Sequence, residues 1–417
     1  MRILKLTQAV EGNLARMREG QDHKAQSVAS RIVADVRRRG DEALFHWTNK
    51  LDRLDLANKG VWASRAEMAS AKRRVSREFV QAVQHAAGNV RRVSEAQRPR
   101  PWSLQVEPGV NLTQLVRPID SVGCYIPGGR FSLFSTMMMT VVPAQVAGAR
   151  EIVVACPGAN DEVLATAALL GVERLARIGG AQAIAALAYG TRQIPRVEKI
   201  FGPGNRFVTA AKQIVSSDCA IDLPAGPTEA MVLARSGNAR WIASDLLAQA
   251  EHAPDAGSYL VTPSHRLAEQ VQNEVESQLM FLPPDNPAHN SCKETGAILL
   301  TRTWSEAIGF VNRFAPEHLS VPDGSTSTLS KIRAAGTVFA GPLGAQPFGD
   351  YASGSNHVLP TGGWARRRGG LSIDDFLTCI SVQTIDRTGF RRLADDVQTL
   401  ANAEGLLAHA NAIEVRR

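Results

Sequence analysis

Gln249 and His252 are the residues whose types and spacing most directly suggest chemistry. They lie three residues apart, after apolar residues with helical spacing and just before Pro254, which marks the end of the predicted helix. Residues i and i+3 share one face of a helix, so an amide oxygen and an imidazole nitrogen would point the same way. Such a pair supplies half of a mixed nitrogen and oxygen metal site suited to zinc. On spacing alone, a histidine that caps the carbonyl groups of its own helix is the more common explanation.

A second group of residues pairs acids with imidazoles. Glu317 and His318 are adjacent, Asp350 follows a glycine, and His357 lies seven residues after Asp350. An imidazole titrates near neutral pH and a carboxylate can deprotonate water, so Glu317 and His318 would suit acid–base catalysis. Taken in isolation, an adjacent Glu-His pair is more often part of a surface loop.

Three glycine clusters each follow a predicted strand: Gly128-Gly129, Gly179-Gly180 and Gly202-Pro203-Gly204. Open α/β sheets bind ligands at the carboxyl ends of their strands, where helix N-termini direct backbone N–H groups. The clusters are therefore candidate cofactor turns. None of them has the GxGxxG spacing of a dinucleotide fingerprint, and glycines that simply form strand-to-helix turns explain them equally well.

The elements that must position these residues alternate between strands and helices from about residue 119 onward, which predicts parallel sheets with right-handed crossovers. We expect an α/β fold of two open, mostly parallel Rossmann-like units joined near residues 230–240. The predicted strands span residues 121–126, 151–155, 174–178, 199–201, 220–223 and 230–233, and then 258–261, 297–300, 318–321 and 337–340.

The two ends of the chain are predicted to be helical. Residues 20–110 keep helical spacing, and residues 390–413 read as one or two helices after an Arg/Gly-rich stretch at 364–370. Glu404 and His409 lie in this tail, where a histidine is usually a surface residue.

Composition indicates a soluble globular protein of two or more domains. The chain has 417 residues, 44% hydrophobic and 21% charged residues, and a net charge of +7. Its short basic runs lack interleaved aromatics, which disfavours nucleic-acid binding. No signal sequence or membrane span is apparent. The five cysteines are scattered and odd in number, as in a reduced, cytoplasmic protein.

Together these segments resemble the histidinol dehydrogenase family, in the family's order, from about residue 20 to the end. The matching segments are Arg39-Gly40-Asp41, residues 125–129 (YIPGG), 134–136 (FST), 179–182 (GGAQ), 202–205 (GPGN), 222–229 (DLPAGPTE), 249–252 (QAEH), 315–319 (APEHL), 349–351 (GDY) and 355–361 (SNHVLPT), with Glu404 and Ala408-His409.

The resemblance implies that the protein oxidises L-histidinol through histidinal to L-histidine with two NAD⁺, the last step of histidine biosynthesis. It also implies a role for each matching residue. Zinc would be bound by Gln249, His252, Asp350 and His409; Glu317 and His318 would be the acid–base pair; Tyr125, Gln182 and Asn205 would contact NAD; and substrate would contact Thr228, Glu404 and His318 besides the metal ligands.

The resemblance further implies a homodimer in which each C-terminal tail completes the partner's site. We divide the chain into an N-terminal arm (1–20), an α/β domain with the metal and catalytic residues (21–118 with 233–371), an NAD-binding domain (119–232) and a helical tail (372–417). The chain departs from the family at Thr228, where Ser is usual, at Arg130 in the cofactor loop, and in the more basic segment 366–370.

Two alternatives remain open. The first is a paralogous zinc- and NAD-dependent dehydrogenase of another small polar alcohol. Glu404 bears on it, because a carboxylate near the substrate suits an ammonium group and disfavours an anionic substrate. The second is a zinc hydrolase in which Glu317 acts on a metal-bound water; it would leave the three glycine turns unexplained.

Overall fold

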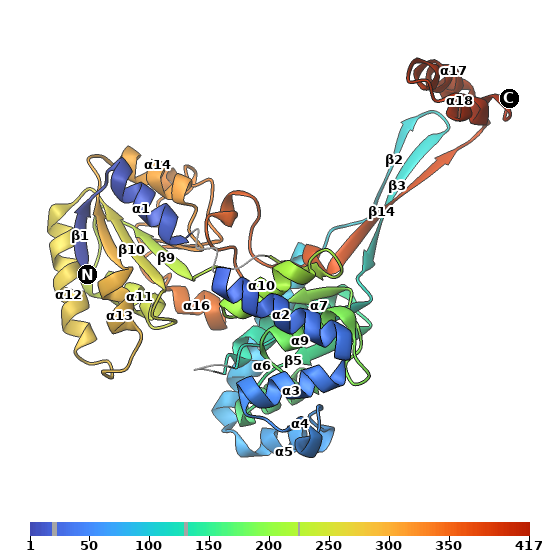
Figure 1. Ribbon diagram of the computed structural model, residues 1–417. Helices are drawn as coiled ribbons and strands as arrows, with labels where there is room; N and C mark the ends of the chain where they lie inside the picture. Colours follow the sequence, from blue (N-terminus) through green and yellow to red (C-terminus); the bar gives the residue numbers. More distant parts are fainter. Residues whose placement is uncertain (19–22, 129–131, 224–225) are drawn as a thin grey trace.

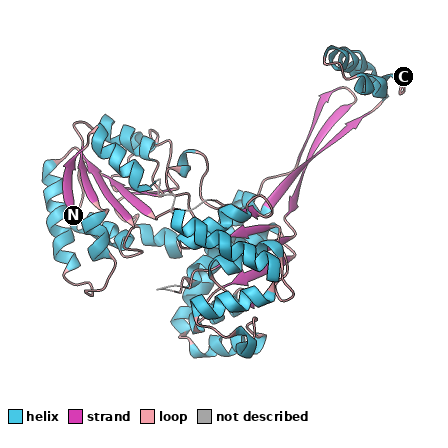
Figure 2. Ribbon diagram, in the orientation of Figure 1, coloured by secondary structure: helices cyan, strands magenta, loops and turns pink. Residues whose placement is uncertain are grey.

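The computed structural model describes residues 1–18, 23–128, 132–223 and 226–417. Within these residues the strands form three sheets. Figures 1 and 2 show two α/β lobes and a long β-arm that projects from one of them and carries the last two helices. Gly129 and Arg130 of the predicted cofactor loop, and Pro224 and Ala225 of the DLPAGPTE segment, lie outside the described residues.

The first lobe is built on a parallel sheet with the strand order β6-β5-β4-β7-β8. Its strands are β4 (Ser121–Tyr125), β5 (Glu151–Ala155), β6 (Arg174–Ala176), β7 (Lys199–Phe201) and β8 (Ala220–Ile221). The chain adds β5 and β6 on one side of β4, and β7 and β8 on the other. The strand order therefore reverses between β4 and β7, which is the usual position of the ligand crevice in open α/β sheets.

Helices cover both faces of this sheet, and alternate strand residues point to opposite faces. One face is covered by α2 (His23–Arg39), α3 (Asp41–Asp52), α9 (Gly180–Tyr189) and α10 (Arg206–Val215), with the short α4 (Leu56–Lys59) beside them. The other is covered by α5 (Arg65–Arg74), α6 (Arg77–Gln97), α7 (Phe134–Ala147) and α8 (Asp161–Leu169).

The predicted grouping of residues 21–118 with 233–371 is wrong for the helical part of this range, because α2 to α6 pack on the first lobe. The physical reason lies in α9, in which Ala181 to Ala188 are all buried. A helix that is apolar all round must be covered on its outer side as well. The apolar stripe of α2, including Ile32 and Val36, provides this cover.

The second lobe is a six-stranded, fully parallel sheet with the order β1-β11-β10-β9-β12-β13. Its strands are β1 (Arg2–Lys5), β9 (Glu229–Leu233), β10 (Gly257–Thr262), β11 (Ala297–Leu300), β12 (His318–Val321) and β13 (Thr337–Ala340). One face is covered by α11 (Ala239–Ala250), α12 (His265–Leu279) and α13 (Ala288–Glu294), and the other by α1 (Gln8–Arg18) and α14 (Trp304–Phe314). The short helices α15 (Thr326–Leu329) and α16 (Gln346–Tyr351) follow β12 and β13.

Residues 1–20 were predicted to be an arm, and this prediction is wrong for the described residues 1–18. β1 is an edge strand whose residues Arg2 to Lys5 pair with Ala297 to Leu300 of β11. Ile3 joins the apolar cluster on one face of the sheet, and Leu4 joins the cluster on the other. Burial on both faces, as a strand in a parallel sheet requires, places this segment in the body of the protein.

The arm is an antiparallel sheet with the order β14-β3-β2, formed by β2 (Trp102–Glu107), β3 (Val110–Pro118) and β14 (Leu377–Ile385). The predicted helical character of residues 20–110 therefore ends before residue 102. The 3₁₀ turns η1 (Trp364–Arg366) and η2 (Ile373–Phe376) precede β14, and α17 (Arg387–Ala403) and α18 (Leu407–Glu414) follow it at the tip of the arm (Figure 1).

Among the helices of the described residues, none is long and apolar enough to cross a membrane.

Candidate active site

Gln249 and His252 lie at the carboxyl end of α11. Gln249 is fully buried; its Nε2 donates to Thr228 Oγ1 over 2.9 Å, and its Oε1 accepts from Gln346 Nε2 over 2.8 Å. The exposed His252 has its Nδ1 at 2.9 Å from the Ala248 carbonyl. Since only a protonated Nδ1 can donate there, the lone pair lies on Nε2. Helix capping and metal binding by His252 are therefore compatible, because the cap fixes the tautomer that a ligand needs.

Glu317 and His318 lie at the amino edge of the six-stranded sheet, where β12 begins beside β9, and both are buried. Glu317 Oε2 accepts from Thr228 Oγ1 over 2.7 Å and from the Glu229 backbone nitrogen over 2.9 Å. His318 Nδ1 lies 3.3 Å from the Glu229 carbonyl, which accepts its proton. Its Nε2 has no hydrogen-bond partner among the described residues. This burial excludes the surface-loop explanation of the Glu-His pair.

The charges around His318 set the protonation of the site. His318 Nε2 lies 3.6 Å from Asp350 Oδ1, and His318 Nδ1 lies 3.7 Å from Glu317 Oε2. Burial acts to lower the pKa of His318, but the two carboxylates outweigh it and the pKa is raised. Burial acts to raise the pKa of Asp350, but the imidazoles of His318, His357 and His252 together lower it. The site therefore combines an ionised Asp350 with an imidazole that readily takes up a proton.

His357 connects this cluster to the first lobe. Its Nδ1 lies 2.8 Å from the backbone oxygen of Asp350, and its Nε2 lies 3.0 Å from Thr136 Oγ1 in α7. Burial lowers the pKa of His357, which keeps it neutral and able to serve as donor and acceptor at once. The residue stood out in the sequence as an imidazole in a glycine-rich loop, but spacing gave it no role.

One chain brings three of the four predicted metal ligands to one place. Gln249 and Asp350 lie on α11 and α16, which are in contact, and His252 is close enough to act on the charge of Asp350. His409, in α18, and Glu404, at the end of α17, are exposed, and both helices lie at the tip of the arm, well away from the two lobes (Figure 1). Among the described residues, no group of three or more His, Cys, Asp and Glu could hold a metal ion.

Tyr125, Gln182 and Asn205 lie at the carboxyl edge of the five-stranded sheet. Tyr125 ends β4 and Asn205 follows β7, the two strands between which the order reverses, whereas Gln182 follows the outer strand β6. The Gly180 backbone nitrogen donates to the Tyr125 hydroxyl over 3.2 Å. Asn205 is the N-cap of α10, and Gln182 lies in the first turn of α9. Gly202 follows β7 with φ +111°, and a Cβ there would lie 2.1 Å from the Tyr125 carbonyl oxygen, so only glycine fits.

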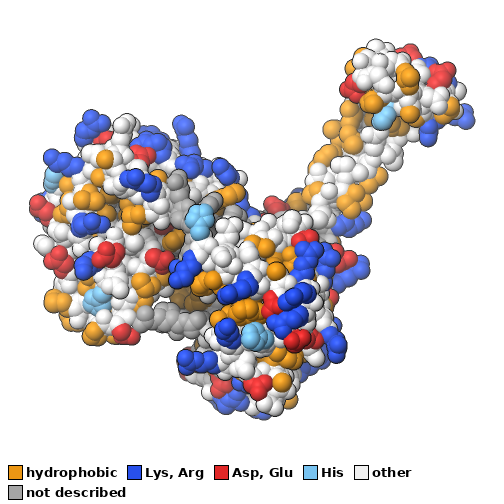
Figure 3. Space-filling view, in the orientation of Figure 1, with side chains coloured by type: hydrophobic (Ala, Val, Ile, Leu, Met, Phe, Trp, Pro, Cys, Tyr) orange, Lys and Arg blue, Asp and Glu red, His pale blue; other side chains and the backbone are white. Residues whose placement is uncertain are grey.

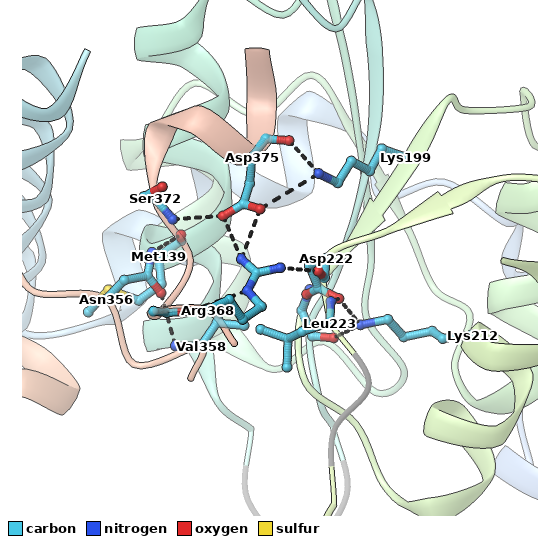
Figure 4. A network of polar contacts seen from close by, with 12 residues as sticks. Met139, Lys199, Lys212, Asp222, Leu223, Asn356, Val358, Arg368, Ser372 and Asp375 are labelled. Atoms are coloured by element: carbon cyan, nitrogen blue, oxygen red, sulfur yellow. Dashed lines mark hydrogen bonds and ion pairs between the residues drawn. The ribbon is translucent and has the colours of Figure 1, made fainter. Parts of the chain in front are cut away.

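A buried charge network around Asp222 supports the Gly202 turn, and Figure 4 shows its charged members Lys212, Asp222, Arg368 and Asp375. The Lys212 ammonium donates to Asp222 Oδ1 and, over 2.9 Å, to the Gly202 carbonyl; Asp222 Oδ2 accepts from the Gly202 nitrogen over 2.7 Å. Arg368 donates to the Asp222 carbonyl and, over 2.8 and 2.9 Å, to the carboxylate of Asp375. The basic segment 366–370 thus contributes a structural arginine.

Sequence reasoning missed several partners of the site. Arg18 of α1 forms a bidentate ion pair with the buried Glu229, the residue whose backbone holds Glu317 and His318. Burial raises the pKa of Glu229 to about 7, against the lowering effect of Arg18. Arg18 and Glu229 are 211 residues apart, so no local spacing could have paired them.

The fold and the site define a class: an α/β protein whose first lobe has the strand order of dinucleotide-binding folds and whose second lobe carries a buried acid–base cluster. Comparisons with known proteins identify the family. The family model described as histidinol dehydrogenase matches residues 15–417. The chain therefore belongs to the histidinol dehydrogenase family, as the sequence predicted, and is an oxidoreductase.

Individual relatives agree with this assignment. The chain is 45% identical over 404 residues to a histidinol dehydrogenase of Halalkalibacterium halodurans, with 95% of each chain covered. It is 43% identical over 408 residues to that of Methanosarcina barkeri, covering 95% of this chain and 93% of the relative. The crystal structure of histidinol dehydrogenase from Elizabethkingia anophelis matches with a TM-score of 0.94 and 37% identity, covering 100% of this chain and 98% of that one.

Proposed function

We propose that the protein oxidises L-histidinol to L-histidine through histidinal, transferring one hydride to NAD⁺ in each of two steps. Besides family membership, the observation that carries this proposal is the buried Glu317–His318 pair. Both residues are fixed by the Glu229 backbone, at 2.9 and 3.3 Å, and the two oxidations need different proton acceptors.

In the first step, the His318 Nε2 lone pair takes the hydroxyl proton as the carbinol carbon gives up its hydride. In the second, Glu317 takes a proton from water as the water oxygen bonds to the aldehyde carbon, and the protonated His318 returns its proton to the aldehyde oxygen. The resulting diol then gives up a hydride to the second NAD⁺ and a hydroxyl proton to His318. The hydrogen bonds from Thr228 and Glu229 hold the Glu317 carboxylate in one orientation. The unpartnered Nε2 of the buried His318 is then available to the substrate.

We propose that zinc is held by Gln249, His252, Asp350 and His409. The donors suit it: one amide oxygen, two imidazoles and a carboxylate make a mixed nitrogen and oxygen set of borderline softness. When bound, zinc would anchor the substrate's imidazole and amine. Hydrogen bonds within the chain already orient two of these donors. The Ala248 carbonyl fixes the tautomer of His252, and the Gln346 side chain orients the Gln249 amide.

We propose a homodimer in which the tail of each chain supplies His409 and Glu404 to the partner's site, where Glu404 would contact the substrate. The support is that both residues lie at the end of a projecting arm (Figure 1). Apolar side chains gather along this arm in Figure 3, and several are exposed, including Trp102, Leu104 and Ile380. Exposed apolar surface of this kind marks interaction sites.

NAD is proposed to bind at the carboxyl edge of the five-stranded sheet, against Tyr125, Gln182 and Asn205, and Thr228 is proposed to contact the substrate. We also propose a cytoplasmic location. All five cysteines are free, four of them buried, as expected in a reducing compartment.

Formation of NADH, followed by absorbance with L-histidinol and with a panel of other small polar alcohols, tests the proposal. We expect turnover of histidinol, two NADH per molecule consumed, and loss of activity with a chelator that is reversed by added zinc. Preferred oxidation of another alcohol would favour the paralogous dehydrogenase instead. Release of a hydrolysis product with no NADH would overturn the oxidoreductase mechanism altogether.

A further inference from the structure

The two polar atoms of the Gln182 side-chain amide have very different surroundings. The residue is fully buried, and its Nε2 donates to Asp52 Oδ2 over 2.9 Å. Its Oε1 is also buried but has no hydrogen-bond partner among the described residues. Buried polar atoms are almost always paired, so an unpaired carbonyl oxygen in a well-packed helix calls for an explanation.

Asp52 decides which end of the amide is left unpaired. An ionised carboxylate can only accept hydrogen bonds, so Asp52 pairs with the NH₂ group of Gln182. Rotation of the amide by 180° is disfavoured, because it would bring the amide oxygen against a carboxylate oxygen. Asp52 is the last residue of α3 and reaches α9 from outside the sheet. Among the described residues the Gln182 side chain has no other hydrogen-bond partner, so this one contact orients it.

The free oxygen lies at the glycine turn between β6 and α9. A Cβ on Gly180 would lie 2.6 Å from Gln182 Oε1, and Gly180 has φ +63°, so the turn leaves this oxygen room that any other residue would fill. The Gly180 nitrogen donates to the hydroxyl of Tyr125. The unpaired oxygen, the tyrosine and the turn thus lie together at the edge of the sheet where the cofactor is proposed to bind.

We propose that Asp52 is a positioning residue for the cofactor. It holds the Gln182 amide so that Oε1 accepts a hydrogen bond from an N–H or O–H donor of NAD, either the nicotinamide carboxamide or a ribose hydroxyl. Asp52 does not touch the cofactor and acts only through Gln182. The inference rests on the proposed NAD-dependent function and deepens it.

The test is a double-mutant cycle on NADH binding by the zinc-loaded enzyme, read by fluorescence titration and by KM for NAD⁺. We expect Asp52→Ala to weaken NADH binding about tenfold, as loss of an oriented hydrogen bond does, and to raise KM for NAD⁺ with little change in kcat. Asp52→Asn keeps an acceptor but can also donate to the rotated amide, so it should fall between Asp52→Ala and the wild type.

Gln182→Met, similar in shape but without hydrogen-bonding groups, separates positioning from packing. If Asp52 acts through Gln182, the double variant should bind NADH no more weakly than Gln182→Met alone. Glu42→Ala, on the exposed side of the same helix, is the matched control and should leave binding unchanged. Acetylpyridine adenine dinucleotide, which lacks the carboxamide N–H, distinguishes the donors: its affinity should be insensitive to Gln182→Met if the carboxamide is the donor, and sensitive if a ribose hydroxyl is.

Additive losses in the double variant, or an Asp52→Ala enzyme that binds NADH as tightly as wild type, would overturn the proposal. A parallel rise in KM for histidinol together with a lower melting temperature would assign Asp52 a structural role instead. If wild type itself failed to bind NADH, the proposed function would fail first, which keeps the two failures distinct.

Discussion

Gln249 and Glu317 are joined through a single hydroxyl group. Thr228 Oγ1 accepts from Gln249 Nε2 over 2.9 Å and donates to Glu317 Oε2 over 2.7 Å. A proposed metal ligand and a proposed proton acceptor are thus oriented by the same side chain. A serine at this position would carry the same hydroxyl, so the departure that the resemblance implies at Thr228 preserves the connection.

Thr228→Val should disrupt both partners, because it leaves a buried amide N–H and a carboxylate oxygen without their hydrogen bonds. A misplacement worth about 1.4 kcal/mol lowers turnover about tenfold, and we expect at least this loss with histidinal. Thr228→Ser should stay close to wild type. Steady-state rates with histidinol and histidinal provide the measurement, and wild-type turnover by Thr228→Val would show that the hydroxyl orients neither residue.

His318→Asn and Glu317→Gln should separate the two oxidations. His318 is needed when the hydroxyl proton leaves and Glu317 chiefly when water is activated, and loss of a general base costs about 10²–10⁴-fold. We expect His318→Asn to slow both steps and Glu317→Gln to slow mainly the second. Single-turnover assays started from histidinol and from histidinal report each step. Unimpaired histidinal oxidation by Glu317→Gln would remove its assignment to water activation.

Mixing two inactive chains should restore activity if the sites are shared. A His252→Asn chain lacks a ligand in the body, and a His409→Asn chain lacks one in the tail. In a heterodimer with two-fold exchange, one site carries both defects and the other carries neither, so about half of the sites should work. Activity and zinc content are measured after subunit exchange. If native mass spectrometry detected heterodimers but no activity returned, the sites would not be shared, and each tail would serve the site of its own chain.

Lys212→Met should destabilise the first lobe strongly. Lys212 and Asp222 form a buried ion pair with side chains 4% and 0% exposed, and removal of one partner leaves a buried charge uncompensated at a cost of about 3–5 kcal/mol. Adding Asp222→Asn should recover part of this loss. Denaturant unfolding measures the stability of the single and the double variant. If Lys212→Met were as stable as the wild type, water would have to enter the network and solvate Asp222.

Asp52→Asn should change how stability depends on pH. Burial raises the pKa of Asp52 from 3.8 to about 6, against the lowering effect of the Gln182 hydrogen bond. Below pH 4 the carboxyl is protonated in both states; between pH 4 and 6 the unfolded chain ionises first, so the wild type loses stability as the pH rises. Above pH 6 the deficit is complete, about 2 kcal/mol after allowance for partial exposure to solvent. Asp52→Asn has no ionising group at this position, so the variant should become more stable than the wild type as the pH rises from 4 to 6. Chemical unfolding at several pH values measures this. A stability difference that does not change with pH would contradict the raised pKa of Asp52.

The buried strands could be predicted closely from the sequence. The predictions for β5, β7, β11 and β12 match the observed bounds, because a strand covered on both faces is a short apolar run between turn residues. The bounds predicted for the edge strand β13 also match, although only Phe339 of this strand is buried. The arm could not be predicted in this way. Trp102, Leu104 and Val106 alternate as a strand would, but all three are exposed, so the pattern lacks the buried face that would distinguish it.

The candidate site was predictable to the extent that it lies in continuous motifs. Its residues were named from the resemblance; the structure places Glu317 and Asp350 beside His318 and links Gln249 to Glu317 through Thr228. Their supporting partners were not predictable, because contacts such as Asp52 with Gln182 span 130 residues. Such a pairing is decided by how helices pack, and single-sequence patterns carry no information on it.

The pairing of β1 with β11 has a consequence for biosynthesis. The first lobe draws most of its core from the continuous segment 23–221, so this segment can begin to fold while later residues are still being added on the ribosome. The second lobe joins Arg2–Lys5 to Ala297–Leu300, and its last strand ends at Ala340. Residues 2–5 must therefore wait, unpaired, until residues 297–300 have been added, which makes the second lobe the slower of the two to assemble.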